Sequence, residues 1–206
     1  MAVLAPGNLG RLPGRKRPWS TVGRRAVKRT SNAAEIAHNL GLAAWFGGTL
    51  FGQVALNPTV SSISDRRERG RVLNESWGRF NAANAPALAA ALLAWRLGGL
   101  NDDAELRAPA LARVKDLLLG GAAVNAVVSG ILGTRIARQS SGGATPVESG
   151  TEPASETPEE SANSQRMISF FGTGSLVLSA AAIAVSGMIE NEPIKPRGIL
   201  SRLLTS

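Results

Sequence analysis

Largely apolar runs alternate with charged segments along this chain. Four runs are long enough to be helices that cross a bilayer, because an apolar core of about 30 Å takes about 20 helical residues. They cover residues 36–56, 80–100, 117–134 and 167–189. The pattern therefore predicts an all-α fold, namely an integral membrane four-helix bundle in which each run is one span.

The run at 36–56 has three interpretations: a buried helix of a soluble domain, a signal sequence or a membrane span. A signal peptide has an apolar region of about 7–15 residues followed by a small-residue cleavage site. This run is longer and reaches Asn57-Pro58 without a convincing site. We therefore predict an uncleaved first span that stops at Asn57, because the residue before a proline is disfavoured in a helix.

The remaining segments set the predicted domain limits. We expect a basic, disordered N-terminal tail at residues 1–32, a four-span domain at 33–190 and a C-terminal tail at 191–206. Between the third and fourth runs, the segment 139–165 carries five glutamates and no lysine or arginine. It is rich in Ser, Gly and Pro and buries too little apolar surface to offset its chain entropy, so we predict a disordered acidic loop.

The segment 59–79 mixes charges with apolar side chains. Val72, Leu73, Trp77 and the following Phe80 fall roughly on one helical stripe. Two interpretations are equally compatible with this spacing. One is an interfacial helix that leads into the second span, and the other is a helical extension of that span.

The net charge of +8 arises from an uneven distribution of basic residues. Residues 1–32 hold eight Lys and Arg and no acid, which by itself equals the net charge. A basic segment beside an apolar run is typical of a cytoplasmic flank, so we expect a multi-pass protein of the cell membrane with both termini in the cytoplasm. An organelle membrane stays open, because the first 30 residues are also arginine-rich and acid-free like a transit peptide.

Composition removes most kinds of catalytic and metal site. The chain has no Cys and a single His, which excludes disulfides, thiolate sites and multi-histidine metal sites within one chain. Phosphate-binding, serine-hydrolase and zinc-protease signatures are missing. We therefore expect no enzymatic activity, no catalytic residue, no metal and no cofactor. Asp116 borders the third span, and Lys115 beside it suggests a solvated interfacial pair.

Small and polar residues recur at helical spacing in three of the four runs. Within lipid, helices associate through close packing of small residues and through interhelical hydrogen bonds. The residues that we expect to pack the helices together are Gly41, Trp45, Gly48, Gly52, Gly121, Gly133, Ser175 and Ser179. The polar candidates for lining an intramembrane cavity are His38, Gln53, Asn84, Asn125 and Ser129. Packing alone is the favoured interpretation, because such stripes are ordinary in spanning helices.

His38 is the only histidine and lies in the first turn of the first run. An ionisable residue at membrane depth suggests a function. This position is shallow, so we favour a neutral histidine bonded to a neighbouring helix over a proton relay or a ligand contact. Glu35, three residues earlier on the same side of the helix, is a candidate partner for the protonated form.

Several of these features recur in a fixed order over about residues 33–189: an early His, then "GLAAWFGGTLFG", an Asn-Pro exit, a basic loop, a polar insert and "RMISFFGTGSLVLS". In that order they resemble the transmembrane-protein-205-like group of small four-span membrane proteins. The resemblance implies a four-helix membrane protein of poorly defined activity, with some members linked to drug or metal-drug resistance and secretion. The long basic tail, the lack of Cys and the acidic insert depart from the group. The positions that carry the resemblance are His38, Trp45, Gly47, Gly48, Pro58, Phe171 and Gly172.

These observations favour an accessory or partner-binding subunit of a membrane, without enzymatic activity. Its partners would be the lipid bilayer and either another membrane protein or a second copy of the chain. Nucleic acid is not expected, because no binding signature accompanies the positive charge. The alternative is an exporter or permease for a small solute or drug, acting as an oligomer because four spans are few for a carrier.

Overall fold

The described part of the chain is almost entirely helical. The computed structural model describes the backbone of residues 19–193 and the side chains of residues 32–193. Within that part no β-strand occurs, and Val147 and Pro153 form an isolated bridge. The prediction of an all-α fold is therefore confirmed.

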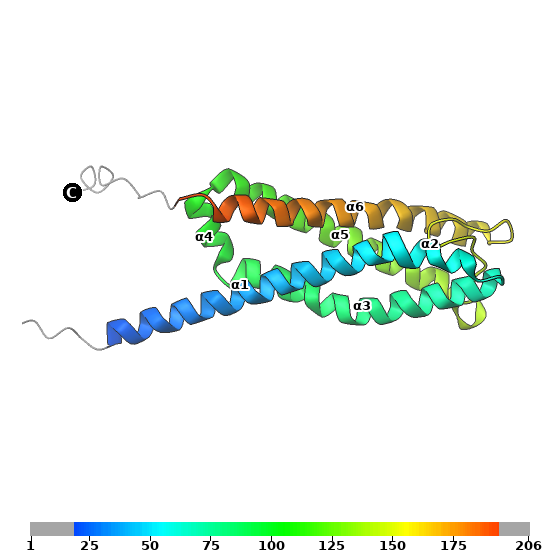
Figure 1. Cartoon of the computed structure of the whole chain (residues 1–206), viewed down its shortest axis with the longest axis horizontal. Helices are drawn as coiled ribbons and strands as arrows, with labels where there is room; N and C mark the ends of the chain where they lie inside the picture. The colour runs from blue at the N-terminus through cyan, green and yellow to red at the C-terminus, as the bar shows by residue number, and fades with distance from the viewer. Residues whose placement is uncertain (1–18, 194–206) are drawn as a thin grey trace, which may run out of the picture.

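Four long helices lie side by side (Figure 1). Each of the four apolar runs falls mainly within one of them: α1 (Trp19–Phe51), α3 (Arg66–Leu97), α5 (Pro109–Gln139) and α6 (Glu159–Glu190). Helix α1 packs along α3, α5 packs along α6, and α1 also contacts α6. The main core lies between these helices and includes Leu42, Trp45, Ala91, Trp95 and Leu119.

The first apolar run does not end at Asn57 as predicted. Helix α1 passes into a π-helix (Gly52–Leu56), then α2 (Asn57–Thr59) and a 3₁₀ turn (Val60–Ser62). The Asn57 backbone is in the right-handed helical region, and its N–H donates to the carbonyl of Gly52 five residues earlier. This wide turn accommodates Pro58, which has no N–H of its own to bond to the preceding turn.

The charged segment after it is a continuous extension of the second run. Helix α3 begins at Arg66, where the Asp65 side chain accepts hydrogen bonds from the backbone N–H groups of Arg67 (2.7 Å) and Glu68 (3.1 Å). Such a cap satisfies N–H groups that have no partner within the helix. The helix ends at Leu97, three residues before the predicted limit, and the interpretation as a separate interfacial helix is wrong.

A short helix that the pattern did not predict follows α3. Gly99 has a positive φ of 79° and is the N-cap of α4 (Leu100–Arg107). A glycine at this point allows the sharp change of direction that places α4 across the end of the long helices, as Figure 1 shows. The helical backbone is interrupted again at Ala108, and α5 then begins with Pro109 in its first turn.

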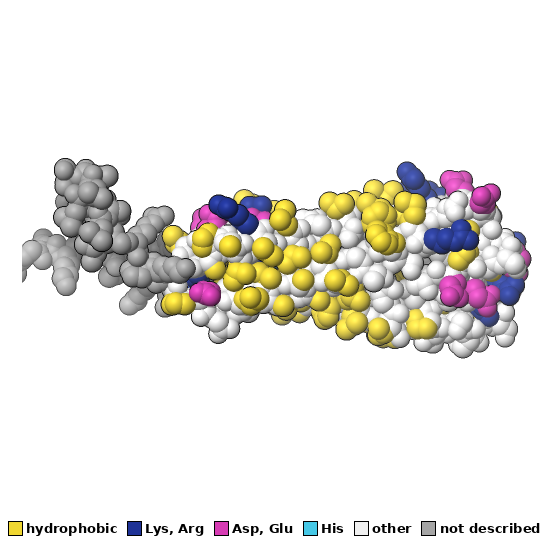
Figure 2. Space-filling model, turned by 90° about the horizontal axis from the view of Figure 1, so that it is seen from above, with side chains coloured by type: hydrophobic (Ala, Val, Ile, Leu, Met, Phe, Trp, Pro, Cys, Tyr) yellow, Lys and Arg dark blue, Asp and Glu magenta, His cyan; other side chains and the backbone are white. Residues whose placement is uncertain are grey.

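Apolar side chains cover much of the outer surface. Two helices, α5 and α6, are long and apolar enough to cross a membrane. Figure 2 shows hydrophobic side chains over the middle of one face and charged side chains toward its two ends. We call the exposed apolar residues of the long helices and the π-helix the apolar belt: Ile36, Leu40, Leu50, Phe51, Val54, Leu93, Leu97, Val114, Leu117, Val124, Val127, Ile131, Met167, Phe170, Val177, Ile183 and Met188.

The acidic segment between α5 and α6 departs from the predicted disorder. Residues 140–158, which we call the capping segment, lie at one end of the long helices and include the 3₁₀ turn Ser141–Gly143 (Figure 1). The N–H of Val147 donates to the carbonyl of Arg66 (3.1 Å), and Thr145 and Val147 are buried. The composition argument failed because α2 and α3 supply the apolar and hydrogen-bonding surface that the segment itself lacks.

The two predicted tails lie mostly outside the residues that the structure describes. Residues 19–32, which we expected to be disordered, belong to α1. Residues 1–18, and 194–206 of the predicted C-terminal tail, lie outside the described residues.

Candidate functional site

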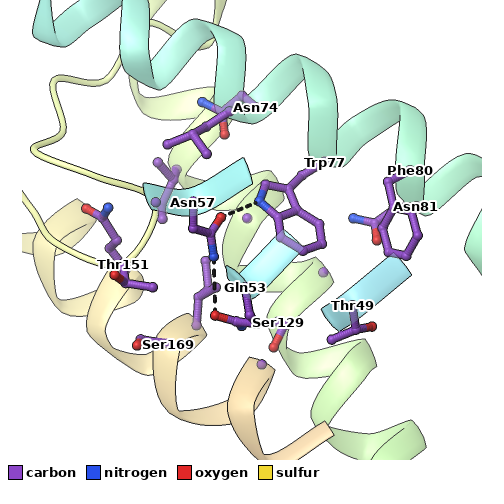
Figure 3. Close-up of a pocket in the computed structure, with 18 of the residues that line it drawn as sticks. Thr49, Gln53, Asn57, Asn74, Trp77, Phe80, Asn81, Ser129, Thr151 and Ser169 are labelled. Carbon is purple, nitrogen blue, oxygen red and sulfur yellow. Dashed lines mark hydrogen bonds between the residues drawn. The ribbon is translucent and has the colours of Figure 1, made fainter. Parts of the chain in front are cut away.

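A cavity of about 140 Å³ with both apolar and polar groups in its wall lies between the helices, toward the end that the capping segment covers. All four long helices and the capping segment contribute to its wall. We call it the amide cavity, because amide side chains are prominent in its wall (Figure 3). Its polar lining residues are Thr49, Gln53, Asn57, Asn74, Asn81, Asn84, Ser129, Thr145, Thr151, Gln165, Ser169 and Ser175.

Aromatic rings form another part of the wall. Trp77 and Phe80 of α3 meet edge to face, with ring centroids 5.5 Å apart and planes at 77°. They lie against Gly48 and Gly52, where a Cβ atom would overlap the Phe80 and Trp77 rings respectively. These glycines, one in α1 and one at the start of the π-helix, therefore allow two large rings of α3 to line the cavity. Trp45, which is fully buried, is a third aromatic lining residue.

A chain of hydrogen bonds orders the amides beside these rings. The Trp77 indole N–H donates to Oδ1 of Asn57 (3.1 Å), and Nδ2 of Asn57 donates to Oε1 of Gln53 (3.3 Å; Figure 3). The two residues lie four apart in the region of the wide turn of α1, which brings their side chains to the same side. The wide turn that accommodates Pro58 thus also helps to position the polar wall.

Two buried polar atoms of the wall have no hydrogen-bond partner within the described residues. They are Oδ1 of Asn84 and Oγ of Ser129. A buried donor or acceptor without a partner costs about 1–3 kcal/mol. The Asn84 side chain is 9% exposed, so a molecule inside the cavity is the natural source of a donor for it.

The amide cavity has no acidic or basic side chain among its described lining residues. It combines hydrogen-bonding groups with the faces and edges of aromatic rings. Such a wall suits an uncharged ligand with polar edges and an apolar face, because an ion would leave water without an opposite charge to receive it. An engineered cavity of about 150 Å³ accepts benzene, so the volume fits a small organic molecule.

The capping segment covers one end of this cavity by close backbone contacts. At Gly70 of α3, a Cβ atom would overlap the backbone of Thr145, and at Gly150 it would overlap the Asn57 side chain. The N–H of Gly150 donates to the carbonyl of Asn57 (2.9 Å), and Nε2 of Gln165 donates to the carbonyls of Ser149 (2.9 Å) and Glu152 (3.2 Å). The segment is therefore attached to α2, α3 and α6.

Ion pairs add to this attachment. Arg66 bonds to Glu156 (2.9 Å) and Glu148 (3.0 Å), and Nη1 of Arg69 donates to the side chain (3.1 Å) and the backbone carbonyl (2.9 Å) of Glu148. The Arg66 guanidinium lowers the pKa of the Glu156 carboxyl to about 2 from its ordinary value of 4.5. The acidic character of the segment is thus matched by the first turn of α3.

Three of the five predicted polar residues meet in the amide cavity: Gln53, Asn84 and Ser129. Asn125 is not among its described lining residues and instead lies against Gly174 of α6. His38 lies at the opposite end, where its Nδ1–H donates to the carbonyl of Ala91 in α3 (2.7 Å).

The predicted packing residues mostly lie between helices. Gly41, Gly48 and Gly52 face α3, and Trp45 belongs to the core cluster. In the second pair of helices, Gly121 approaches Leu178, the Ser175 hydroxyl donates to the carbonyl of Ala122 (3.4 Å) and Ser179 is fully buried. Gly133 differs, because nothing lies within 4 Å of its Cβ position and it lines the amide cavity.

Several residues near the two ends of the helix assembly were not predicted correctly from the sequence. Asn57, Trp77 and Phe80 were assigned to a span exit and a loop stripe, although all three line the amide cavity. Lys115 was expected in a solvated pair with Asp116, and this is wrong, because Lys115 is 3% exposed. Its neighbours are on other helices, which a one-dimensional pattern does not reveal.

No family model matches this chain, and no curated protein or solved structure matches it either. The resemblance to the transmembrane-protein-205-like group therefore stays a prediction. The two ends of the helix assembly and the apolar belt between them are the features that indicate a function.

Proposed function

We propose that the chain is a four-span membrane protein that binds and conducts a small uncharged solute through its amide cavity. The four long helices are the proposed spans, with the apolar belt facing lipid. The observation that carries the solute proposal is the charge-free wall of the amide cavity with the unpartnered, buried Oδ1 of Asn84.

The apolar belt supports the membrane part of the proposal. In the most apolar window of α5 only 17% of the residues are buried, and in that of α6 only 28%. A core helix of a soluble protein buries most of such a window, whereas a lipid-facing helix leaves it on the outside. The uncharged stretch 167–189 of α6 is about 33 Å long at 1.5 Å per residue, close to the thickness of a bilayer core.

The charges outside the belt favour the same arrangement. On α3 and α5 the uncharged stretches are 80–95 and 117–134. On the face drawn in Figure 2, charged side chains lie toward the two ends of the described part. The positive-inside rule then puts the helix end near α4 in the cytoplasm and the capping segment outside.

The chemistry of the cavity defines the proposed solute class. Amide and hydroxyl groups would bond to polar edges, and Trp77 and Phe80 would contact an apolar face. Small sugars, polyols and amides have this combination of groups. Since the described wall offers no ionisable group, we propose no ion coupling at this cavity.

The partner-binding function remains a second proposal, which the apolar belt would support if another membrane protein covered part of it. We place it second because the belt has members on all four long helices and would also suit lipid. The amide cavity, in contrast, has a defined wall with a buried polar group that lacks a partner.

Osmotic swelling of proteoliposomes tests the solute proposal without a labelled substrate. Vesicles with the full chain would be exposed to gradients of glycerol, urea and glucose and followed by stopped-flow light scattering. We expect faster swelling than in protein-free vesicles with at least one solute, a loss of that gain in Asn84→Leu and its retention in Asn125→Leu. The control removes an amide of the same kind that does not line the cavity. Rates equal to protein-free vesicles for all three solutes would refute conduction.

A further inference from the structure

A second cavity, of about 170 Å³, lies at the end of the helices opposite the capping segment. Residues of α1, α3, α4, α5 and α6 line it, so five helices converge there. We call it the charged cavity, because five of its lining residues are formally charged: Glu35, Asp103, Arg107, Lys115 and Glu190. It shares no lining residue with the amide cavity.

Lys115 and His38 are the buried polar residues of this cavity, at 3% and 2% exposure. Both contact one side chain of α3: the Lys115 ammonium lies 3.9 Å from the centroid of the Trp95 ring, and the His38 ring stacks on the same ring with centroids 5.5 Å apart. The Trp95 indole N–H donates to Oδ1 of Asp116 (2.8 Å), which fixes the ring. Helix packing therefore holds a cation and an imidazole in defined places.

The hydrogen bond of His38 determines what its other nitrogen requires. A carbonyl oxygen only accepts, so Nδ1 carries the proton that is donated to Ala91. In the neutral ring Nε2 is then an acceptor, and it has no hydrogen-bond partner within the described residues. The charged cavity thus contains a buried acceptor that a donor group of a ligand would satisfy.

The charges of this cavity remain separate from one another. Among residues 32–193, no ion pair joins any two of the five, and none of them pairs with another charged side chain. At the capping end, in contrast, Arg66, Arg69, Arg71 and Arg79 all pair with glutamates. Acids and bases that share one cavity without pairing are arranged to receive a ligand that itself carries both charges.

The donors and acceptors come from different helices. Helix α1 contributes two acceptors, the Glu35 carboxylate and Nε2 of His38, which lie three residues apart on one side of the helix. The cationic donors, Arg107 and Lys115, come from α4 and α5. A ligand ammonium beside α1 and a ligand oxyanion beside Lys115 would satisfy both sets.

We propose that the charged cavity binds a zwitterion with a primary ammonium and a nearby oxyanion, the chemistry of a phosphatidylethanolamine headgroup. The oxyanion accepts from Lys115 and Arg107, and the ammonium donates to His38 and Glu35. The cavity lies at the end of the apolar belt, so a lipid source of this zwitterion rests on the proposed membrane position. A free zwitterion would have the same chemistry, and the test separates the two.

Thermal unfolding of the purified full chain in detergent tests this site. The probes are phosphatidylethanolamine, phosphatidylcholine, phosphatidylglycerol and water-soluble glycerophosphoethanolamine, each titrated while tryptophan fluorescence reports Tm. We expect phosphatidylethanolamine to raise Tm most, because a trimethylated ammonium donates no N–H bond and the glycerol headgroup has no cation. A comparable effect of glycerophosphoethanolamine at equal concentration assigns the site to free zwitterions, and a much weaker effect assigns it to lipid.

Variants at the two walls complete the test. Glu35→Gln removes an exposed carboxylate with little risk to folding, and Lys115→Gln removes the buried cation. Each is expected to raise the apparent dissociation constant of the stabilising probe roughly tenfold, which corresponds to about 1.4 kcal/mol, because each variant removes a hydrogen bond to a charged group. The control is Arg79→Gln, a highly exposed cation at the other end of the molecule.

Equal Tm shifts with the three lipids, or an undiminished phosphatidylethanolamine effect in Glu35→Gln, would overturn the proposal. The same holds if no probe changes Tm. Where Lys115→Gln fails to fold, Glu35→Gln decides the question, because its carboxylate is on an exposed residue. The swelling assay uses Asn84 at the other cavity, so failure of one proposal leaves the other unaffected.

Discussion

The contact between Gly70 and Thr145 provides a sharp test of the capping segment. Gly70 is buried in α3, and a Cβ atom there would overlap the backbone oxygen of Thr145. A backbone atom cannot rotate away as a side-chain end would, so Gly70→Ala must displace the segment or distort α3. Overpacking of this kind costs about 1–3 kcal/mol.

Gly78 of the same helix is the matched control. It is exposed, and nothing lies within 4 Å of its Cβ position. Replacing a glycine inside a helix by alanine stabilises the helix by about 0.5–1 kcal/mol. Gly78→Ala should show this gain alone, whereas in Gly70→Ala the overlap should exceed it. The two variants should therefore differ in sign, and in total by about 1–3 kcal/mol.

Two measurements read out the difference. The Tm of each variant in detergent should separate by several degrees, because about 1 kcal/mol corresponds to about 2–4 °C in a chain of this size. Hydrogen exchange should rise within residues 140–158 in Gly70→Ala and stay unchanged in Gly78→Ala. If the Gly70 variant is as stable as the Gly78 variant with unchanged exchange, the capping segment does not contact α3 as described.

Further predictions concern pH and topology. Because Arg66 lowers the pKa of Glu156 to about 2, the folded form binds a proton less readily than the unfolded one, and the stabilisation is present above pH 4.5 and is lost as pH falls toward 2. The protection of the capping segment against hydrogen exchange, relative to the intrinsic exchange rate at each pH, should therefore fall between pH 5 and pH 3 in the wild type, and this loss should shrink in Glu156→Gln; an identical loss in both would assign it to other groups. The chain has no Cys, so Ser149→Cys and Asp102→Cys can be labelled one at a time in intact cells. We expect an impermeant maleimide to modify only the cysteine at position 149, and equal labelling of both positions would contradict an odd number of spans between them.

The positions of the long helices could be predicted from the sequence because the signal is local. Uncharged runs such as 117–134 and 167–189 lie within single helices. The charged residues that flank each run belong to the same helix or follow it directly. The limit at Asn57 could not be predicted, because the proline rule assumes an ordinary α-helical turn before it. The turn at Gly52–Leu56 is a π-helix, so the assumption does not hold there. The stability of this π-helix depends on packing against α3.

The amide cavity was only partly predictable for a similar reason. Gln53, Asn84 and Ser129 were recognised as polar residues within apolar runs, which is a property of the sequence alone. Trp77 and Phe80 were not, because they lie beyond or at the edge of the second run. A signal was nevertheless present: Gly48 of α1 and Gly52 of the π-helix leave space that large side chains of a neighbouring helix fill.

The order of the capping segment was hidden because its partners are distant in the sequence. A composition rule asks whether a segment can bury its own apolar surface. Here Val147 packs against Val60 and Leu73, and Glu148 and Glu156 pair with Arg66. A short segment with few apolar residues can be ordered when a preformed helix end provides complementary charge.

The two helix ends use charge in opposite ways, and this difference connects the two proposed sites. At the capping end, arginines and glutamates neutralise each other, which holds residues 140–158 over a cavity with no charge in its described wall. At the other end, acids and bases of the described residues share a cavity without an ion pair between them, beside a histidine nitrogen without a donor among the same residues. Pairing within the protein stabilises a lid, whereas unpaired charges of both signs can also bind a ligand that carries both charges. We therefore expect the capping end to control access to an uncharged solute and the opposite end to hold a zwitterion.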